Sequence, residues 1–274
     1  MAFALMCIMM AACGGQKQAS QQDDSQADTT AVADTANMAG QDDDLADAPM
    51  PKAADELFDD FIFNFCASRK LQMERVDFPL PSVKGDQKTT ITKDQWKMEH
   101  FFMEQGYYTL IFDNERHMEV VKDTSVHHAV VEKIFLDTGN IRQYVFNRRR
   151  GAWMLTTVNT IPVSESSNAS FLTFFHHFAT DKEFQARSLG ETVHFVGPDP
   201  DDDFAQMEGE ITPDTWEAFA PELPQDMLYN IIYGEPVKEG NSKLFVLRGI
   251  ANGMELELTF KRVGNSWQLV KLVT

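Results

Sequence analysis

The chain has 274 residues, a formal net charge of −18 and a hydrophobic content of 43% that includes 21 phenylalanines. The acidic balance argues against nucleic acid as a partner, because a phosphate backbone is bound by clustered Lys and Arg, and it disfavours electrostatic adhesion to anionic lipid. The length suffices for two domains of ordinary size, and the phenylalanines are numerous enough for each half to bury a hydrophobic core.

The chain begins with an apolar run of Ala, Phe, Leu, Met and Ile that is too short to span a bilayer as a helix. This run resembles the hydrophobic part of a secretory signal. It ends in Met10–Gly14 (MAACG), which resembles a bacterial lipobox, although Met10 replaces the usual Leu and no Lys or Arg precedes the run.

The lipobox resemblance implies a lipoprotein-type signal segment over residues 1–13 with lipid attachment at Cys13. It also implies a location in the cell envelope, as an outer-membrane lipoprotein that is periplasmic or surface-exposed, with membrane contact through the lipid anchor only. An ordinary signal peptide that happens to contain Cys13 is the alternative.

Residues 14–54 are a polar, acidic stretch with almost no large apolar side chain. Such a composition cannot bury enough surface to offset its ordering entropy, so we expect a disordered tether. Gln21–Asp24 resembles the acidic export tag of surface-exposed lipoproteins of the Bacteroides type. Thr29 and Thr35, each preceded by Asp, resemble the O-glycosylation sites of such bacteria. Plain low complexity is the alternative for both features.

A helix is predicted over residues 55–72, because Phe58, Phe61, Ile62 and Phe65 recur at the spacing of one helical face. A proline-containing break follows. The rest of this half predicts a short helix and then four strands: 92–103, followed by 107–112, 126–136, 141–148 and 153–161.

A polar joint over residues 162–168 leads to a second helix with a phenylalanine face, predicted over 169–189. A short strand is expected at 192–196, followed by an acidic loop and a short helix at 213–219. Four further strands complete the half: 227–233, 243–250, 254–263 and 266–273.

The second half repeats markers of the first half in the same order, at offsets of about 113–120 residues that drift only by loop insertions. This pattern favours one α+β unit that occurs twice; two unrelated α+β domains with similar patterning are the alternative. The matching segments are Leu71–Gln72 with Phe184–Gln185, Ile91–Trp96 with Ile211–Trp216, Tyr107–Phe112 with Met227–Ile232, and Phe146–Leu155 with Phe260–Leu269.

Helices followed by antiparallel strands, with a Trp in the last strand, predict an α+β unit whose helix packs on one side of a curved sheet. This order resembles the nuclear-transport-factor-2-like (cystatin-like) superfamily, and the tandem pair behind a lipobox resembles an uncharacterised domain family of Bacteroides-type lipoproteins. The resemblance implies two tandem cone-like units, residues 55–163 and 164–274. Because the superfamily contains both enzymes and binding modules, the fold does not choose between these functions.

One acidic stretch is a candidate metal site. Counted as in an EF-hand loop, calcium ligands would fall on Asp199, Asp201, Asp203 and Glu210. Phe204 occupies the position where the EF-hand has Gly, so a solvated acidic loop is the favoured interpretation, and no cofactor other than calcium is indicated.

No catalytic group is recognised. Cys66 follows the phenylalanine face and is expected to be a buried small hydrophobe. The adjacent histidine pairs at 127–128 and 176–177 point apart on a helix or a strand, which disfavours zinc binding.

The sequence therefore favours a non-catalytic, lipid-anchored envelope protein that binds a small molecule, a glycan or a protein partner. A hydrolase or isomerase with its site in one sheet concavity is the first alternative, and a structural scaffold is the second.

Overall fold

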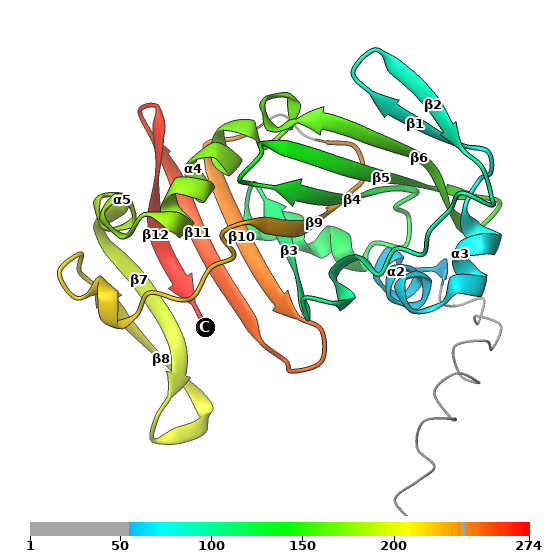
Figure 1. Ribbon diagram of the computed structural model, residues 1–274. Helices are drawn as coiled ribbons and strands as arrows, with labels where there is room; N and C mark the ends of the chain where they lie inside the picture. Colours follow the sequence, from blue (N-terminus) through cyan, green and yellow to red (C-terminus); the bar gives the residue numbers. More distant parts are fainter. Residues whose placement is uncertain (1–54, 237–238) are drawn as a thin grey trace, which may run out of the picture. The chain divides into compact units, whose positions relative to one another are not determined.

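The computed structural model describes residues 55–236 and 239–274 (Figure 1). The first half places two α-helices before six strands. Two short 3₁₀ segments interrupt the run of strands: η2 (Phe101–Met103) before the third strand, and η3 (Glu115–Lys122) after it. The helices and strands are α2 (Phe58–Ala67), α3 (Arg69–Arg75), β1 (Leu80–Lys84), β2 (Gln87–Ile91), β3 (Tyr107–Phe112), β4 (His128–Phe135), β5 (Asn140–Arg149) and β6 (Ala152–Pro162).

The second half has the same order of elements. Its 3₁₀ segments are η4 (Val163–Glu165), which precedes the first helix, and η5 (Trp216–Ala218). Its helices and strands are α4 (Ala169–Thr180), α5 (Lys182–Arg187), β7 (Leu189–Asp199), β8 (Asp202–Ile211), β9 (Met227–Tyr233), β10 (Ser242–Gly249), β11 (Glu255–Val263) and β12 (Ser266–Val273).

The strands of these residues form one hydrogen-bonded sheet of 12 strands, in the order β2-β1-β6-β5-β4-β9-β3-β10-β11-β12-β7-β8. Most neighbours are antiparallel, and the sheet is curved with few helices, as Figure 1 shows. The predicted α+β class is therefore confirmed. No helix within the described ranges is long and apolar enough to cross a membrane.

Each long helix predicted from the phenylalanine pattern is divided in two. Ser68 lies in extended conformation after α2, and its hydroxyl accepts a hydrogen bond from Leu71 N at 3.2 Å, which caps α3. Asp181 separates α4 from α5 in the same way and accepts from Phe184 N at 2.9 Å. The continuous helices predicted over 55–72 and 169–189 are wrong at these points, because Ser and Asp favour the start of a helix over its interior.

The hairpins β1–β2 and β7–β8 form the two ends of the sheet, where the sequence predicted a break, one short strand and an acidic loop. β1 pairs parallel with β6, and β7 pairs parallel with β12. The side chains of β2 are almost all exposed, so the alternating apolar pattern that identifies a strand is missing there. The predicted helices 92–103 and 213–219 contract to short 3₁₀ turns, η2 and η5.

The halves exchange a strand at the centre of the sheet. β4 pairs antiparallel with β9 from the second half, and β10 pairs antiparallel with β3 from the first half. β3 and β9 are themselves parallel and are joined through the pair Thr109–Asn230. The sequence analysis expected each run of strands to form its own sheet, whereas the strands of both halves belong to one continuous sheet.

The exchanged strand β3 is buried on both faces. Tyr108 and Leu110 belong to the hydrophobic core that contains α2, whereas Tyr107 and Ile111 pack against the core that contains α4. Because successive side chains of a strand point to opposite faces, α2 and α4 cover opposite faces of the central strands.

The predicted phenylalanine faces are confirmed as the core-facing sides of α2 and α4. Phe58 packs edge-on against Trp153 with ring centroids 4.9 Å apart, and Phe171 packs edge-on against Trp267 at 5.7 Å. Cys66 is fully buried as expected, and burial raises the pKa of its thiol, which keeps it protonated and unreactive.

Candidate functional site

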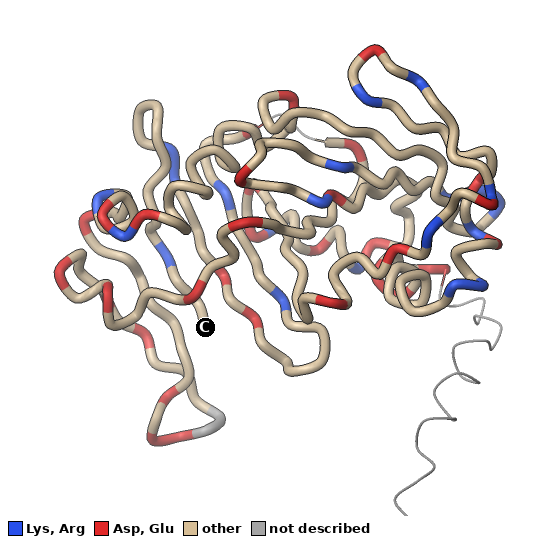
Figure 2. Tube along the Cα trace, in the orientation of Figure 1, with Lys and Arg blue, Asp and Glu red and all other residues tan. Residues whose placement is uncertain are grey.

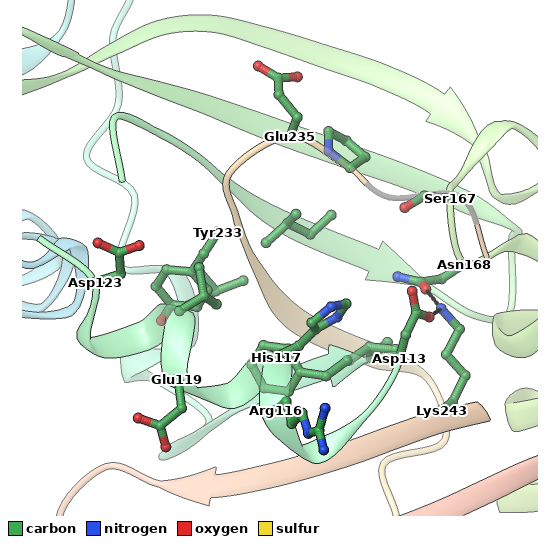
Figure 3. Close-up of a pocket in the computed structure, with 16 residues that line it drawn as sticks. Asp113, Arg116, His117, Glu119, Asp123, Ser167, Asn168, Tyr233, Glu235 and Lys243 are labelled. Atoms are coloured by element: carbon green, nitrogen blue, oxygen red, sulfur yellow. Dashed lines mark hydrogen bonds and ion pairs between the residues drawn. The ribbon is translucent and has the colours of Figure 1, made fainter. Parts of the chain in front are cut away.

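A cavity of about 580 Å³ lies where β3 and β9 end. Its walls are the last residues of these two strands, the segment η3, the start of β10 and the two short segments 167–168 and 235–236 (Figure 3). The apolar part of the wall consists of Ile111, Phe112, Val120, Ile231, Ile232 and Pro236. A cavity of this size with a mainly apolar wall is typical of small-molecule sites.

The strand pairing explains why the cavity exists. β3 and β9 are paired at Thr109–Asn230, and no further pair between them follows within the described residues. Beyond that point, consecutive residues of both strands line the cavity, Ile111 to Asp113 on one side and Ile231 to Tyr233 on the other. Successive side chains of a strand point to opposite faces of the sheet. Because consecutive residues line the cavity, the edges of the two strands themselves form part of its wall.

A buried polar cluster closes one end of the cavity. The Lys243 ammonium donates hydrogen bonds to Asp113 Oδ1 and to Asn168 Oδ1, each at 2.6 Å (Figure 3). Lys243 is only 2% exposed and Asn168 only 5%. A buried ammonium requires a paired carboxylate and satisfied hydrogen bonds, so Asp113 and Asn168 hold Lys243 in place and are themselves oriented by it.

Tyr233 occupies another part of the wall, and its hydroxyl donates a hydrogen bond to Asp59 on α2. Burial raises the pKa of Asp59, while the hydrogen bond from Tyr233 and the nearby Arg248 oppose this shift. Burial also raises the pKa of Tyr233, and the Asp59 charge adds to that effect. The pair therefore keeps its protons to higher pH than isolated Asp and Tyr side chains would.

The segment η3 supplies a polar margin. Asn114 caps its start by accepting a hydrogen bond from His117 N at 3.3 Å, which orients the following turn. Arg116, His117 and Glu119 then face the cavity as exposed side chains, and Figure 3 places the His117 ring near the centre of the view. The cavity thus has a buried, charge-balanced end and a hydrated margin.

The calcium ligands expected from the sequence are not brought together. Asp199 ends β7, Asp201 lies in the turn and Asp203 lies near the start of β8, with acidic residues gathered at this hairpin tip (Figure 2). Glu210 pairs with His194 instead, about 26 Å along β8 from the turn at roughly 3.3 Å per residue. The stretch is a hairpin and not one loop.

Calcium binding is therefore left without the fourth expected ligand, and no group of three or more His, Cys, Asp or Glu side chains in the described part of the chain is arranged to hold a metal ion. Cys13, Thr29 and Thr35 lie outside the described residues, so lipid attachment and glycosylation stay predictions.

The sequence analysis did not identify Lys243, Asn168 or Asp113 as site residues. A signal for Lys243 exists, since it is the one charged residue at the head of the apolar run Leu244–Leu247. A buried lysine needs a carboxylate partner, but the strand exchange that brings Asp113 to it has no local sequence signal.

The sheet, the helices packed on it and the cavity at its centre define a nuclear-transport-factor-2-like fold. The chain belongs to the family described as "Domain of unknown function (DUF4348)", which matches residues 37–274. It is similar to a crystal structure of an NTF2-like protein from Bacteroides fragilis NCTC 9343, with 43% sequence identity, a TM-score of 0.74, and coverage of 82% of this chain and 98% of that chain. No curated protein matches the chain.

The predicted resemblance to the NTF2-like superfamily and to an uncharacterised domain family is therefore confirmed.

Proposed function

We propose that this protein binds a small molecule in the cavity between the ends of β3 and β9. The observation that carries the proposal is a cavity of about 580 Å³ whose wall includes branched apolar side chains and whose one end is the buried Lys243–Asp113–Asn168 cluster. Apolar walls supply affinity, and a few fixed polar groups supply orientation.

Binding without catalysis is supported by the pairing of the buried titratable groups around the cavity. Lys243 is held by Asp113 and Asn168, and Tyr233 is held by Asp59. These partners hold the polar groups in fixed positions, so the arrangement suits a rigid recognition site.

A library screen by thermal shift tests the proposal, with Ile232→Trp as the variant that fills the cavity. Ile232 is half-buried in the cavity wall, and the half-buried Ile161, which does not line the cavity, gives the matched control Ile161→Trp. A ligand of the cavity raises the melting temperature of the wild type and of Ile161→Trp but not of Ile232→Trp. Equal stabilisation of all three proteins would place the ligand elsewhere.

We further propose that the protein is anchored at the cell envelope through lipid on Cys13, with residues 14–54 as a tether. The support is the lipobox-like sequence Met10–Gly14 and the apolar run before it. The expected result is that Cys13→Ala moves the protein from the membrane fraction to the soluble fraction. Continued sedimentation of this variant with membranes would contradict the anchor.

An isomerase or hydrolase is the second candidate, and the Asp59–Tyr233 pair favours it, because a carboxyl group with a raised pKa beside a tyrosine is suited to proton transfer. For an enzyme, Asp59→Asn abolishes turnover of the bound ligand and leaves its affinity within a few-fold. For a binding protein, the ligand is recovered unchanged after long incubation with the wild type.

A further inference from the structure

Given that the cavity is a ligand site, as proposed above, we infer that its polar end recognises an uncharged carboxamide group carried on a branched apolar body. The Lys243 ammonium has only donors, so the oxygen of the Asn168 side chain must face it. This fixes the orientation of the Asn168 amide. The Asn168 nitrogen then points away from Lys243 and toward the cavity, as Figure 3 shows.

The Asn168 amide nitrogen donates no hydrogen bond to the described residues, although Asn168 is only 5% exposed. Asp113 uses Oδ1 to accept from Lys243, which leaves its other oxygen as an acceptor. One donor and one acceptor are therefore available at this end of the cavity. Asp113 Oδ1 and Asn168 Oδ1 each lie 2.6 Å from the same Lys243 nitrogen, so these two oxygens lie no more than about 5.2 Å apart and the two head groups are neighbours.

A carboxamide matches this pair, because its carbonyl oxygen accepts from the Asn168 nitrogen while its N–H donates to Asp113. A carboxylate lacks the donor and is repelled by the Asp113 charge. An ammonium lacks the acceptor for Asn168. A buried donor or acceptor that a ligand leaves unpaired costs binding free energy, so the site discriminates among three head groups of similar size.

Charge balance favours the same ligand class. Asp113 and Lys243 neutralise each other at this end of the cavity. A ligand charge placed beside them would be desolvated without a counter-charge, which is costly in a buried site. The head group is therefore neutral, and the charged side chains of η3 lie at the hydrated margin instead.

The apolar body follows from the wall. Ile111, Val120, Ile231 and Ile232 present branched aliphatic surface, and the volume of about 580 Å³ exceeds that of a single side chain. A branched aliphatic group fills such a wall with close contacts, because interiors of proteins pack as densely as organic crystals.

Four probes with the same six-carbon body test the inference on the intact chain: 4-methylpentanamide, 4-methylpentanoate, 4-methylpentylamine and 4-methylpentan-1-ol. Affinities are measured by NMR titration at neutral pH. The amide is expected to bind at least tenfold more tightly than the acid and the amine, and several-fold more tightly than the alcohol, which offers one oxygen where the site offers two groups. Equal binding of the amide and any of the other three would overturn the inference.

Asn168→Asp supplies the variant, since it keeps an oxygen for Lys243 but removes the donor. It is expected to reduce amide affinity at least tenfold. The control Asn265→Asp makes the same change of charge at an exposed turn residue and should leave affinity unchanged. An Asn168→Asp protein that binds the amide as tightly as the wild type contradicts the inference.

The probe series also separates the two proposals. If all four probes bind alike and Ile232→Trp weakens them all, the cavity is a ligand site and the carboxamide inference fails. If Ile232→Trp weakens none of them, or none binds the wild type, the inference fails together with the placement of the ligand in this cavity.

Discussion

Gln72 and Gln185 occupy matched positions in the two halves, and each joins its helix pair to a tryptophan. Gln72 donates to Phe65 O at 2.9 Å and accepts from Trp96 Nε1 at 3.2 Å. Gln185 repeats these contacts, donating to Phe178 O at 3.1 Å and accepting from Trp216 Nε1 at 2.9 Å.

The two glutamines differ in burial and in the further hydrogen bonds that their side chains make. Gln72 is completely buried and makes two further hydrogen bonds with the backbone of Glu99, to its oxygen at 2.8 Å and from its nitrogen at 3.1 Å. Gln185 is only half-buried, and within the described residues its side chain makes no comparable hydrogen bonds with a further backbone segment. The same local framework therefore carries different amounts of polar structure in the two halves.

The centre of the sheet shows the same contrast. Glu132 on β4 is fully buried and accepts from Gln143 Nε2 at 2.9 Å and from Asn230 Nδ2 at 3.1 Å. The matched position on β10 is the buried Val246. One half thus pairs two polar residues, Glu132 and Asn230, on its central strands where the other half pairs Val246 with Leu110. The framework therefore tolerates either pair, and the polar pair is not required by the fold alone.

The largest expected effect comes from separating the halves. Residues 55–163 and 164–274, produced as two fragments, are each expected to remain largely unfolded, because β4 then lacks β9 and β10 lacks β3. Mixing the fragments should restore native structure, followed by circular dichroism and NMR. A fragment that unfolds cooperatively by itself would show that its half is an independent domain and that the exchange is dispensable.

The two glutamines provide the next comparison. Gln72→Leu removes the partner of four backbone and indole groups, two of them in buried hydrogen bonds. We therefore expect it to lower the free energy of unfolding by roughly 3 kcal/mol or more, and Gln185→Leu by about 1 kcal/mol. Urea unfolding measures both. Similar losses for the two variants would mean that the contacts of Gln72 with Glu99 contribute little.

Because Glu132 is buried, we expect it to make the free energy of unfolding depend on pH. Burial raises its pKa in the folded state, and the hydrogen bonds from Gln143 and Asn230 only partly oppose this. The folded protein therefore binds the Glu132 proton more tightly than the unfolded chain does. The contribution of protonated Glu132 to stability is complete below the unfolded-state pKa of about 4.3. It is lost as pH rises through the folded-state pKa, with a slope of at most about 1.4 kcal/mol per pH unit.

Glu132→Gln should abolish this decline. The free energy of unfolding of the variant minus that of the wild type should therefore rise between pH 4 and pH 8. Glu74→Gln is the matched control, because Glu74 is exposed. A flat difference for Glu132→Gln, like that of the control, would show that Glu132 is not buried as described.

The smallest effects are expected at the helix breaks. Ser68→Ala and Asp181→Ala each remove one N-cap and should each cost about 1 kcal/mol. The Asp181 carboxylate also interacts with the positive end of α5, so its loss should cost less at high salt, whereas the cost of Ser68→Ala should not depend on salt. Equal salt dependence of the two variants would remove the charge from this explanation.

The sequence predicted the elements whose residues repeat with a clear period. The phenylalanine faces of α2 and α4 and most of the strands follow from the i, i+3, i+4 and period-two patterns. It missed the β1–β2 hairpin because its side chains are exposed, and it mistook β8 for a loop because of its acidic residues. Edge strands need not bury either face, so no apolar alternation marks them.

The strand exchange had a signal that was not used. Tyr107–Phe112 and Met227–Tyr233 are nearly continuous apolar runs, which is typical of strands buried on both faces. A strand of a two-layer unit would alternate. The site could not be predicted even so, because Lys243 and Asp113 meet only through the long-range pairing of β10 with β3.

The placement of β3 has a consequence for how the molecule melts. Leu110 is part of one hydrophobic core, and the next residue, Ile111, packs against the other. If β3 leaves one core, it also leaves the other, so the two cores lose their order together. Heating should therefore give a single calorimetric peak whose measured enthalpy equals the van't Hoff enthalpy, because the two hydrophobic cores unfold as one cooperative unit.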